Sequence, residues 1–373
     1  MQTVFRYRIF NRVVQLVLPN SLSKTQISDL LAPLALYPEV SADEKHEVEV
    51  EFANSLKCME VLSSNPSNHS ELKDGFVMHN SKFSVALIHH GEVLRYKVYL
   101  SPRRNLIINY LSRLYSMDYA TITQRLSQIF FEQVMVPSVY FNSDQFLVHS
   151  SSMVNANNQA ILIGGTGGVG KTSLEIELCM NRGYTFMSDD ISVVDSDGFA
   201  YPNLAFPKIY AYNTIGNPYL RRLILKERSF HDRIAWHLKL QIFGYSSVRR
   251  KISPEKIYGG YAHAKAKAFK YFMLIKEHRD DLLIKRIDAA TAADMSIAIM
   301  ETEYSDLNKH ILWHEFYCNS KGTEPIVSLS RVKQRWKERF LQVFSDVDIY
   351  ALFIPSGMKH TEFVQKVSDI ISE

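Results

Sequence analysis

Residues 161–190 read ILIGGTGGVGKTSLEIELCMNRGYTFMSDD, and this stretch decides the expected fold. Five of the 15 glycines of the chain fall between positions 164 and 170. A short apolar run precedes them, a helical pattern over 172–181 follows, and a second apolar run over 184–187 leads into two aspartates. The order strand, glycine loop, helix, strand predicts an α/β core in this part of the chain.

The glycine loop matches the pattern G-x-x-x-x-G-K-[ST] from Gly165 to Thr172. A backbone that wraps a phosphate must point several N–H groups at it, which favours residues without side chains. The helix that follows directs the partial positive charge of its N-terminus at the same anion. The motif therefore predicts a nucleotide site in which Lys171 contacts the β- and γ-phosphates and the Thr172 hydroxyl binds Mg²⁺. The alternative interpretation is a flexible glycine turn.

Two adjacent aspartates, Asp189 and Asp190, end the next strand, 18 residues after Lys171 (189 − 171). In an open α/β sheet the carboxyl ends of the strands converge on the ligand crevice. Two carboxylates at that crevice can hold Mg²⁺ and accept a proton from an attacking hydroxyl. The alternative is a turn in which an aspartate caps a helix.

The first 140 residues have a different pattern. Apolar and alternating runs predict strands at 5–18, 47–52, 83–88 and 93–100, the last two joined by a hairpin turn at 89–92. Helical spacing predicts one or two helices over 105–133. We therefore expect an N-terminal strand-rich α+β domain over residues 1–140, for substrate recognition or assembly, and a second domain over 141–373 that contains the glycine loop.

The rest of the second domain also carries recognisable patterns. Basic helices are predicted over 216–250, a buried strand over 269–275, another strand over 349–354 and an amphipathic closing helix over 360–372. Within the basic stretch, Arg249 or Arg250 is the candidate for an arginine that stabilises transition-state charge. Solvent-exposed helix faces are often basic too, so the stretch fits either a catalytic arginine or an ordinary exposed helix.

Composition narrows the class of protein. The 373 residues are 46% hydrophobic and 22% charged, and 43 Lys+Arg against 39 Asp+Glu give a net charge of +4, a profile that excludes a disordered, collagen-like or coiled-coil chain. So small a net charge argues against nucleic acid or a membrane as a partner. The three cysteines are scattered without zinc-ligand spacing, and no run reaches about 18 apolar residues. We expect a cytoplasmic protein with reduced thiols.

With His149-Ser150-Ser151 in front of it, the quoted stretch resembles HPr kinase/phosphorylase and the wider set of HPr-kinase-related proteins, whose core has the phosphoenolpyruvate-carboxykinase-type P-loop fold. The resemblance covers residues 145–210, and His149 lies 22 residues before Lys171 (171 − 149), much as in that family. It implies that the nucleotide phosphates are bound by Gly165, Thr166, Gly167, Gly168, Val169, Gly170, Lys171, Thr172 and Ser173.

The resemblance also implies roles around the phosphates. Asp189 would be the general base, His149 would tune the protonation and position of that aspartate, Lys171 would assist catalysis, and Asp190 with Asp189 and Thr172 would hold Mg²⁺. On the residues alone, His149 fits a core histidine at a strand end at least as well. The sequence lacks the Arg-Gly-Leu-Gly-type segment that HPr kinases carry after the core, and no acidic residue stands out soon after Asp190. These departures favour kinases with a shorter signature set, including those that phosphorylate lasso-peptide precursors at a serine, over a phosphorylase acting on HPr.

We therefore predict an ATP- and Mg²⁺-dependent kinase whose acceptor is a serine hydroxyl of a protein or peptide. One alternative is a small-molecule kinase on the same scaffold. The other is a nucleotide-binding or hydrolysing regulatory module without an acceptor. The sequence leaves open the acceptor, the choice among ATP, GTP and pyrophosphate as donor, and whether the chain forms a homo-oligomer.

Overall fold

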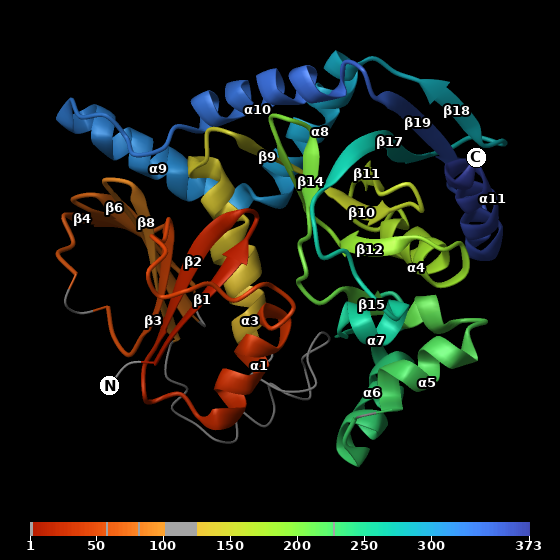
Figure 1. Ribbon diagram of the computed structural model, residues 1–373, viewed down its shortest axis with the longest axis horizontal. Helices are drawn as coiled ribbons and strands as arrows, with labels where there is room; N and C mark the ends of the chain where they lie inside the picture. The colour runs from red at the N-terminus through yellow and green to blue at the C-terminus, as the bar shows by residue number, and fades with distance from the viewer. Residues whose placement is uncertain (1–2, 57–58, 81–82, 101–124, 227) are drawn as a thin grey trace.

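The computed structural model describes residues 3–56, 59–80, 83–100, 125–226 and 228–373. Over these ranges the chain forms a mixed α/β structure with an eight-stranded sheet, a nine-stranded sheet and a two-stranded ribbon (Figure 1). Within the same ranges, none of the helices combines the length and the apolar character that crossing a bilayer requires.

The N-terminal sheet has the strand order β1-β2-β3-β8-β7-β6-β5-β4. Its strands are β1 (Thr3–Ile9), β2 (Arg12–Leu18), β3 (Val48–Ala53), β4 (Ser63–Asn65), β5 (His69–Leu72), β6 (Gly75–His79), β7 (Phe83–His90) and β8 (Val93–Leu100). The four strand predictions in this region are confirmed, and the run 5–18 divides into a hairpin at Phe10 and Asn11, whose φ angles of 52° and 61° turn the chain. The alternation of β3 places every second side chain in the core.

Helices cover this sheet and lead away from it. α1 (Lys24–Leu34) starts with a capping box between Ser23 and Gln26. α3 (Arg125–Phe130) continues into the π-helix η1 (Phe131–Met135) and the 3-10 helix η2 (Pro137–Phe141). These elements confirm the last part of the helical region predicted over 105–133, and its part up to residue 124 lies outside the described residues.

The central sheet has the order β12-β10-β11-β17-β14-β13-β9, and β19 pairs with β17 and β18. Its strands are β9 (Gln145–Val148), β10 (Ser150–Val154), β11 (Gln159–Gly165), β12 (Thr185–Ser188), β13 (Ser192–Asp195), β14 (Phe199–Tyr201), β17 (Ala266–Glu277), β18 (Leu283–Arg286) and β19 (Asp348–Pro355). β11, β17 and β19 are parallel neighbours, whereas β10 runs antiparallel to β11. The sheet is therefore mixed, and the strands predicted over 269–275 and 349–354 lie within β17 and β19.

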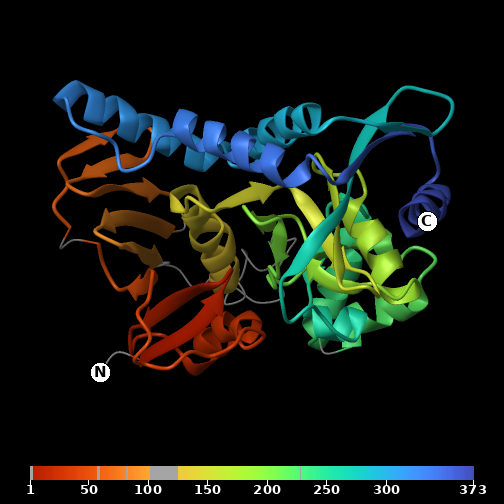
Figure 2. The same ribbon diagram turned by 45° about the horizontal axis from the view of Figure 1, so that its top comes forward.

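Five longer helices accompany the central sheet: α4 (Lys171–Asn181), α8 (Ala289–Glu303), α9 (Ser305–Lys321), α10 (Leu329–Phe344) and α11 (His360–Ser372). α10 buries Val332, Trp336, Phe340 and Phe344, which recur at every fourth position and so share one face. Both ribbon views show α9 over the N-terminal sheet and α10 continuing along the same side (Figures 1 and 2). A single hydrophobic cluster contains side chains from both halves of the chain. The division at residue 140 stays a prediction.

A helical arm projects from the central region (Figure 1). It consists of β15 (Lys208–Tyr210), η3 (Ala211–Thr214), α5 (Pro218–Lys226), α6 (Phe230–Phe243), β16 (Arg249–Lys251) and α7 (Pro254–Tyr258). Arg250 is fully buried here, donates to Asp232 at 2.9 Å and lies over the ring of Trp236. The guanidinium of Arg249 donates to the hydroxyl of Tyr210. Arg250 thus has a place in the core of the arm, which differs from the role considered for it from the sequence.

Candidate functional site

The glycine loop joins the end of β11 to the start of α4, as its sequence predicts. Gly165, Gly168 and Gly170 have φ angles of +139°, +79° and +109°, a region that side-chain-bearing residues rarely adopt. At Gly170, a Cβ atom would stand 2.5 Å from the ring of Phe363. Glycine at position 170 is therefore required both by its dihedral angle and by its neighbour on α11.

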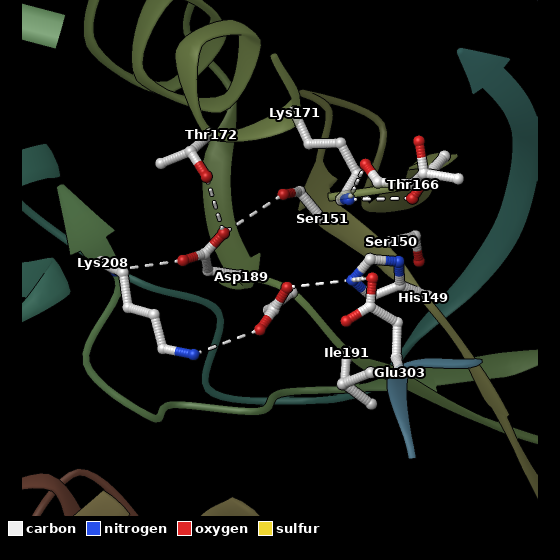
Figure 3. A network of polar contacts seen from close by, with 12 residues as sticks. His149, Ser150, Ser151, Thr166, Lys171, Thr172, Asp189, Ile191, Lys208 and Glu303 are labelled. Atoms are coloured by element: carbon white, nitrogen blue, oxygen red, sulfur yellow. Dashed lines mark hydrogen bonds and ion pairs between the residues drawn. The ribbon is translucent and has the colours of Figure 1, made fainter. Parts of the chain in front are cut away.

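Lys171 begins α4 and points back under the loop (Figure 3). Its Nζ donates to the carbonyl oxygens of Gly165 at 2.9 Å and Thr166 at 3.1 Å. Burial lowers the pKa of this ammonium, and the charges of Asp190 and Asp189 oppose that shift. The loop tip at 166–168 is exposed, so a ligand can reach the backbone that the lysine supports.

Asp189 is held from several sides in a nearly buried position (Figure 3). Its Oδ1 accepts from the Thr172 hydroxyl at 3.1 Å and from the Ser151 hydroxyl at 3.4 Å, and its Oδ2 accepts from the backbone N–H of Lys208 at 3.1 Å. Burial raises the pKa of this carboxyl, and the charge of Asp190 adds to the rise. Asp189 is thus fixed next to the hydroxyl at the start of α4.

Asp190 has a different environment although it is the next residue. Its φ of +74° is uncommon for a residue other than glycine, and such strain concentrates at functional sites. Its Oδ1 is 3.0 Å from His149 Nε2 and its Oδ2 is 3.3 Å from Lys208 Nζ. Burial alone would raise its pKa, but Lys208 and His149 outweigh burial and hold the pKa well below its usual range. The side chain is 48% exposed.

The position of His149 corrects one expectation. The resemblance implied that His149 tunes Asp189, whereas its ring contacts Asp190. The left-handed turn at Asp190 directs consecutive side chains to different partners, so that Thr172 contacts the first aspartate and His149 the second. The Nδ1 atom of His149 is buried without a hydrogen-bond partner among the described residues.

Four charged residues of the site carry no motif, and the sequence did not predict them. Lys208 Nζ lies 2.9 Å from Glu132 Oε1, and Lys251 Nζ lies 3.6 Å from the same oxygen. Glu303, at the end of α8, approaches His149 Nε2 at 3.9 Å (Figure 3). These residues lie on elements that are distant in sequence, so no local sequence pattern predicts that they meet.

Ser173 lies on the other side of the helix start. The side chain is buried and its hydroxyl accepts a hydrogen bond from the Asn213 amide at 2.8 Å. The hydroxyl of Ser173 is therefore engaged with η3, while the hydroxyl of Thr172 faces the aspartates.

A small cavity of about 40 Å³ opens at the two aspartates. Its lining comes from η1, from the segment after β14 and from the start of β15, and includes Phe131, Glu132, Phe206, Lys208, Lys251 and Tyr304. A larger cavity of about 800 Å³ shares Phe206 and Lys251 with it and extends between α1, α5 and α7. The small cavity at the aspartates thus adjoins the larger one at Phe206 and Lys251.

The donor atoms present suit Mg²⁺ better than a transition metal, because they are carboxylate and hydroxyl oxygens. Among the described residues, no group of three or more His, Cys, Asp and Glu is arranged to hold a metal ion. Mg²⁺ is commonly bound by one or two carboxylates together with substrate phosphates, and Thr172 with Asp189 and Asp190 provides that smaller set.

Comparisons with known proteins give a likeness to solved structures but none to families or curated sequences. No protein-family model matches the chain, and no curated protein matches it. Among solved structures, the chain is similar to the Hpr(Ser) kinase/phosphatase from Coxiella burnetii, with 11% identity and a TM-score of 0.22 over 61% of this chain and 93% of that one. At this level of similarity, the function must be argued from the residues of the site.

Proposed function

We propose that the protein is a phosphotransferase that uses Mg²⁺ and ATP to phosphorylate a serine hydroxyl of a protein or peptide. The observation that carries this proposal is the joint placement of two devices. Lys171 and the glycine loop stand at the N-terminus of α4, and Asp189 and Asp190 stand within hydrogen-bond reach of Thr172 and His149.

The donor phosphates would lie in the glycine loop. Its exposed backbone offers N–H groups, and α4 adds the partial positive charge of its N-terminus. The hydrogen bonds from Lys171 to two loop carbonyl oxygens keep its ammonium beneath the loop. From there the ammonium would turn to the β- and γ-phosphates. The loop, the N-terminus of α4 and Lys171 together would bind the triphosphate without a broad basic surface.

Metal binding would fall to Thr172 and Asp189, which already share a hydrogen bond. Mg²⁺ when bound there supplies positive charge that offsets the charge of the transferring phosphoryl group. This assignment leaves Asp190 as the carboxylate that faces the acceptor, since both aspartates border the small cavity but Asp190 is half-exposed whereas Asp189 is buried. The resemblance implied Asp189 as the general base. In this proposal Asp190 is the base and Asp189 is the metal ligand.

The acceptor oxygen bonds to the γ-phosphorus while the bond from that phosphorus to the β,γ-bridging oxygen breaks, and ADP leaves with the electron pair. The acceptor proton passes to Asp190, which His149 and Lys208 orient. Because these two residues also hold the pKa of Asp190 low, the proton moves late, when bond formation to phosphorus has made the acceptor hydroxyl acidic. Positioning and charge stabilisation supply most of the rate enhancement in this reaction class.

The cavities support a serine in a polypeptide as the acceptor. About 10–15 Å³ of cavity volume holds one water, so the cavity of about 40 Å³ has room for a hydroxymethyl group. The adjoining space of about 800 Å³ is large enough for several residues of a chain. Its charged lining consists of Lys226, Arg228, Lys251, Lys256, Asp29 and Glu255. Since Asp29 belongs to α1, the N-terminal region would share in acceptor recognition.

The test is incubation with ATP labelled at the γ-phosphate, Mg²⁺ and a library of serine-containing peptides. We expect label on a serine peptide, and an initial rate of labelling about 10²-fold lower with Asp190→Asn. Label on a small hydroxylated molecule alone would indicate the small-molecule kinase. Label released only as free phosphate would contradict acceptor phosphorylation and support the hydrolysing module.

A further inference from the structure

A third cavity borders the glycine loop, and the proposed phosphoryl transfer does not use it. Its volume is about 170 Å³, and it starts at Gly168, Val169 and Gly170. The remaining walls come from η3, from the ends of β17 and β19, and from the start of α11. Four separate segments of the chain therefore meet beside the loop that would hold the phosphates.

Aromatic rings form much of this cavity. The ring of His360 stands edge-on to Tyr212, with centroids 5.5 Å apart and an interplanar angle of 80°. Phe363 follows one turn later on α11, 6.3 Å from His360. Tyr210 stacks on Tyr212 at 5.3 Å and 21°, which fixes the orientation of that ring from behind. The cavity thus presents planar surfaces rather than flexible aliphatic ones.

The helix that carries two of these rings is firmly attached. Arg182, at the end of α4, donates to Asp369 of α11 at 2.6 Å, and the hydroxyl of Tyr184 donates to the carbonyl of Ile371 at 3.4 Å. At its start, α11 places Phe363 directly against Gly170. The cavity is therefore preformed at a fixed distance from the phosphate loop.

We infer that this cavity binds the nucleobase of the phosphoryl donor, held by ring stacking from Tyr212, His360 and Phe363. The inference rests on the proposed function, because the phosphates in the loop determine where the base begins. A base exposes flat π-faces that aromatic side chains stack on irrespective of its identity. At 170 Å³ the space matches one planar ring system, well below the 300–1,000 Å³ typical of a whole small-molecule site.

The polar groups at the rim can donate hydrogen bonds to a base. Lys276 and His360 border the cavity, and burial together with the charge of Lys276 lowers the pKa of His360. A neutral imidazole can stack and still donate to a ring nitrogen or carbonyl of the base. The donor is accordingly a nucleoside triphosphate, and pyrophosphate, which the sequence left open, has no group to fill this space.

The test compares ATP with tripolyphosphate, which carries the phosphates without a base, by isothermal titration calorimetry in the presence of Mg²⁺. Stacking contributes about 1–3 kcal/mol per base, so His360→Ala and Tyr212→Leu should each weaken ATP binding about 5- to 150-fold. The same variants should leave the affinity for tripolyphosphate unchanged. His360→Phe should retain ATP binding, because it preserves stacking while removing the imidazole nitrogens.

The matched control is Phe316→Ala, which removes a 65% exposed ring on α9 and should change neither affinity. Unchanged ATP binding by His360→Ala and Tyr212→Leu would overturn the inference, and so would equal losses for ATP and tripolyphosphate. Failure of the wild-type protein to bind either compound would overturn both the cavity assignment and the proposed function.

The two proposals fail separately. Label transfer to serine with equal affinity for ATP and tripolyphosphate would keep the phosphotransferase and remove the base site. A base-dependent preference for ATP that His360→Ala abolishes, together with no transfer to any hydroxyl, would keep the site and remove the phosphotransferase.

Discussion

Two clusters of histidine and carboxylate side chains lie inside this protein, and they differ in what surrounds them. In the first, Asp190 contacts His149 and Lys208, has a strained backbone and borders a cavity. In the second, both carboxylate oxygens of Glu71 contact histidines, at 2.6 Å from His69 and 2.9 Å from His314. The same residue types thus form an open site in one place and a closed one in the other.

The closed cluster joins two parts of the chain that are far apart in sequence. His69 and Glu71 lie on β5, whereas His310 and His314 lie on α9, and the Nδ1 atoms of His69 and His310 are 3.0 Å apart. The side chains of Glu71, His69 and His314 are only 2–3% exposed. A buried, mutually satisfied network of this kind stabilises an interface. In this protein, a carboxylate with a shifted pKa therefore indicates a catalytic site only where it also faces a cavity.

The largest expected effect falls on the open site. Lys171→Ala removes the ammonium beneath the glycine loop, and the loss of one such charge from a phosphoryl-transfer site lowers kcat by about 10²–10³-fold or more. The free energy of unfolding should change little, because burial of the ammonium is itself costly. Steady-state kinetics of label transfer and urea unfolding measure the two quantities. A normal kcat for Lys171→Ala would contradict a catalytic role for the glycine loop.

The second-largest expected effect is a difference between the kinetics of the Asp189 and Asp190 variants. Asp190→Asn should lower kcat about 10²-fold, because the acceptor proton loses its recipient, while the Mg²⁺ concentration for half-maximal rate stays the same. Asp189→Asn should instead raise that Mg²⁺ concentration, because Thr172 loses its carboxylate partner. Kinetics over a Mg²⁺ series distinguish the pair. The reverse pattern would restore Asp189 as the base and Asp190 as the metal ligand.

In the closed cluster, mutation should affect stability alone. Glu71→Ala leaves two buried histidines without their acceptor and should reduce the free energy of unfolding by about 3 kcal/mol. The control is Glu51→Ala on β3, where a partly exposed pair with Lys97 at 3.2 Å contributes about 0–1 kcal/mol. Urea unfolding measures both. Loss of label transfer by fully folded Glu71→Ala would contradict a purely structural role.

The smallest expected effect is the pH dependence of the closed cluster. Burial, with smaller contributions from His69, Lys309 and His79, lowers the pKa of His310 from 6.5 to about 3. The unfolded chain therefore takes up this proton near pH 6.5 and the folded chain only near pH 3, so stability is complete above pH 6.5 and falls as the pH drops. The pKa of Glu71 is also below its ordinary value, because its bonds to His314 and His69 outweigh burial, which adds a loss of the same sign at lower pH.

Thermal unfolding midpoints between pH 7.5 and 5 measure this dependence. We expect the midpoint of the wild-type protein to fall toward pH 5 and that of His310→Gln to fall less steeply. Parallel curves for the two proteins would show that His310 does not carry the effect.

Local sequence predicts the elements of the open site better than their contacts. The glycine loop, α4 and the Asp189-Asp190 end of the next strand were predictable, because each depends on residues that are neighbours in sequence. The partner of His149 was not, because the φ of Asp190 decides which way its carboxylate turns. Lys208 and Glu132 meet only when β15 and η1 come together, which leaves no local pattern.

The closed cluster lay outside prediction for the same reason. The strands of the N-terminal sheet follow from their alternation, whereas the placement of α9 on β5 depends on contacts between residues about 240 positions apart, such as His69 with His310 (310 − 69 = 241). A histidine on a strand and two on a helix carry no signal of their pairing until the fold is complete.

The central claim is that the open site transfers a phosphoryl group to a serine. The most direct measurement is the fate of the labelled γ-phosphate of ATP with the wild-type protein, Asp190→Asn and Glu71→Ala side by side. We predict label on a serine peptide with the wild-type protein and with folded Glu71→Ala, and an initial rate of labelling about 10²-fold lower with Asp190→Asn. Equal labelling by the wild-type protein and Asp190→Asn, or label found only as free phosphate, would contradict the claim.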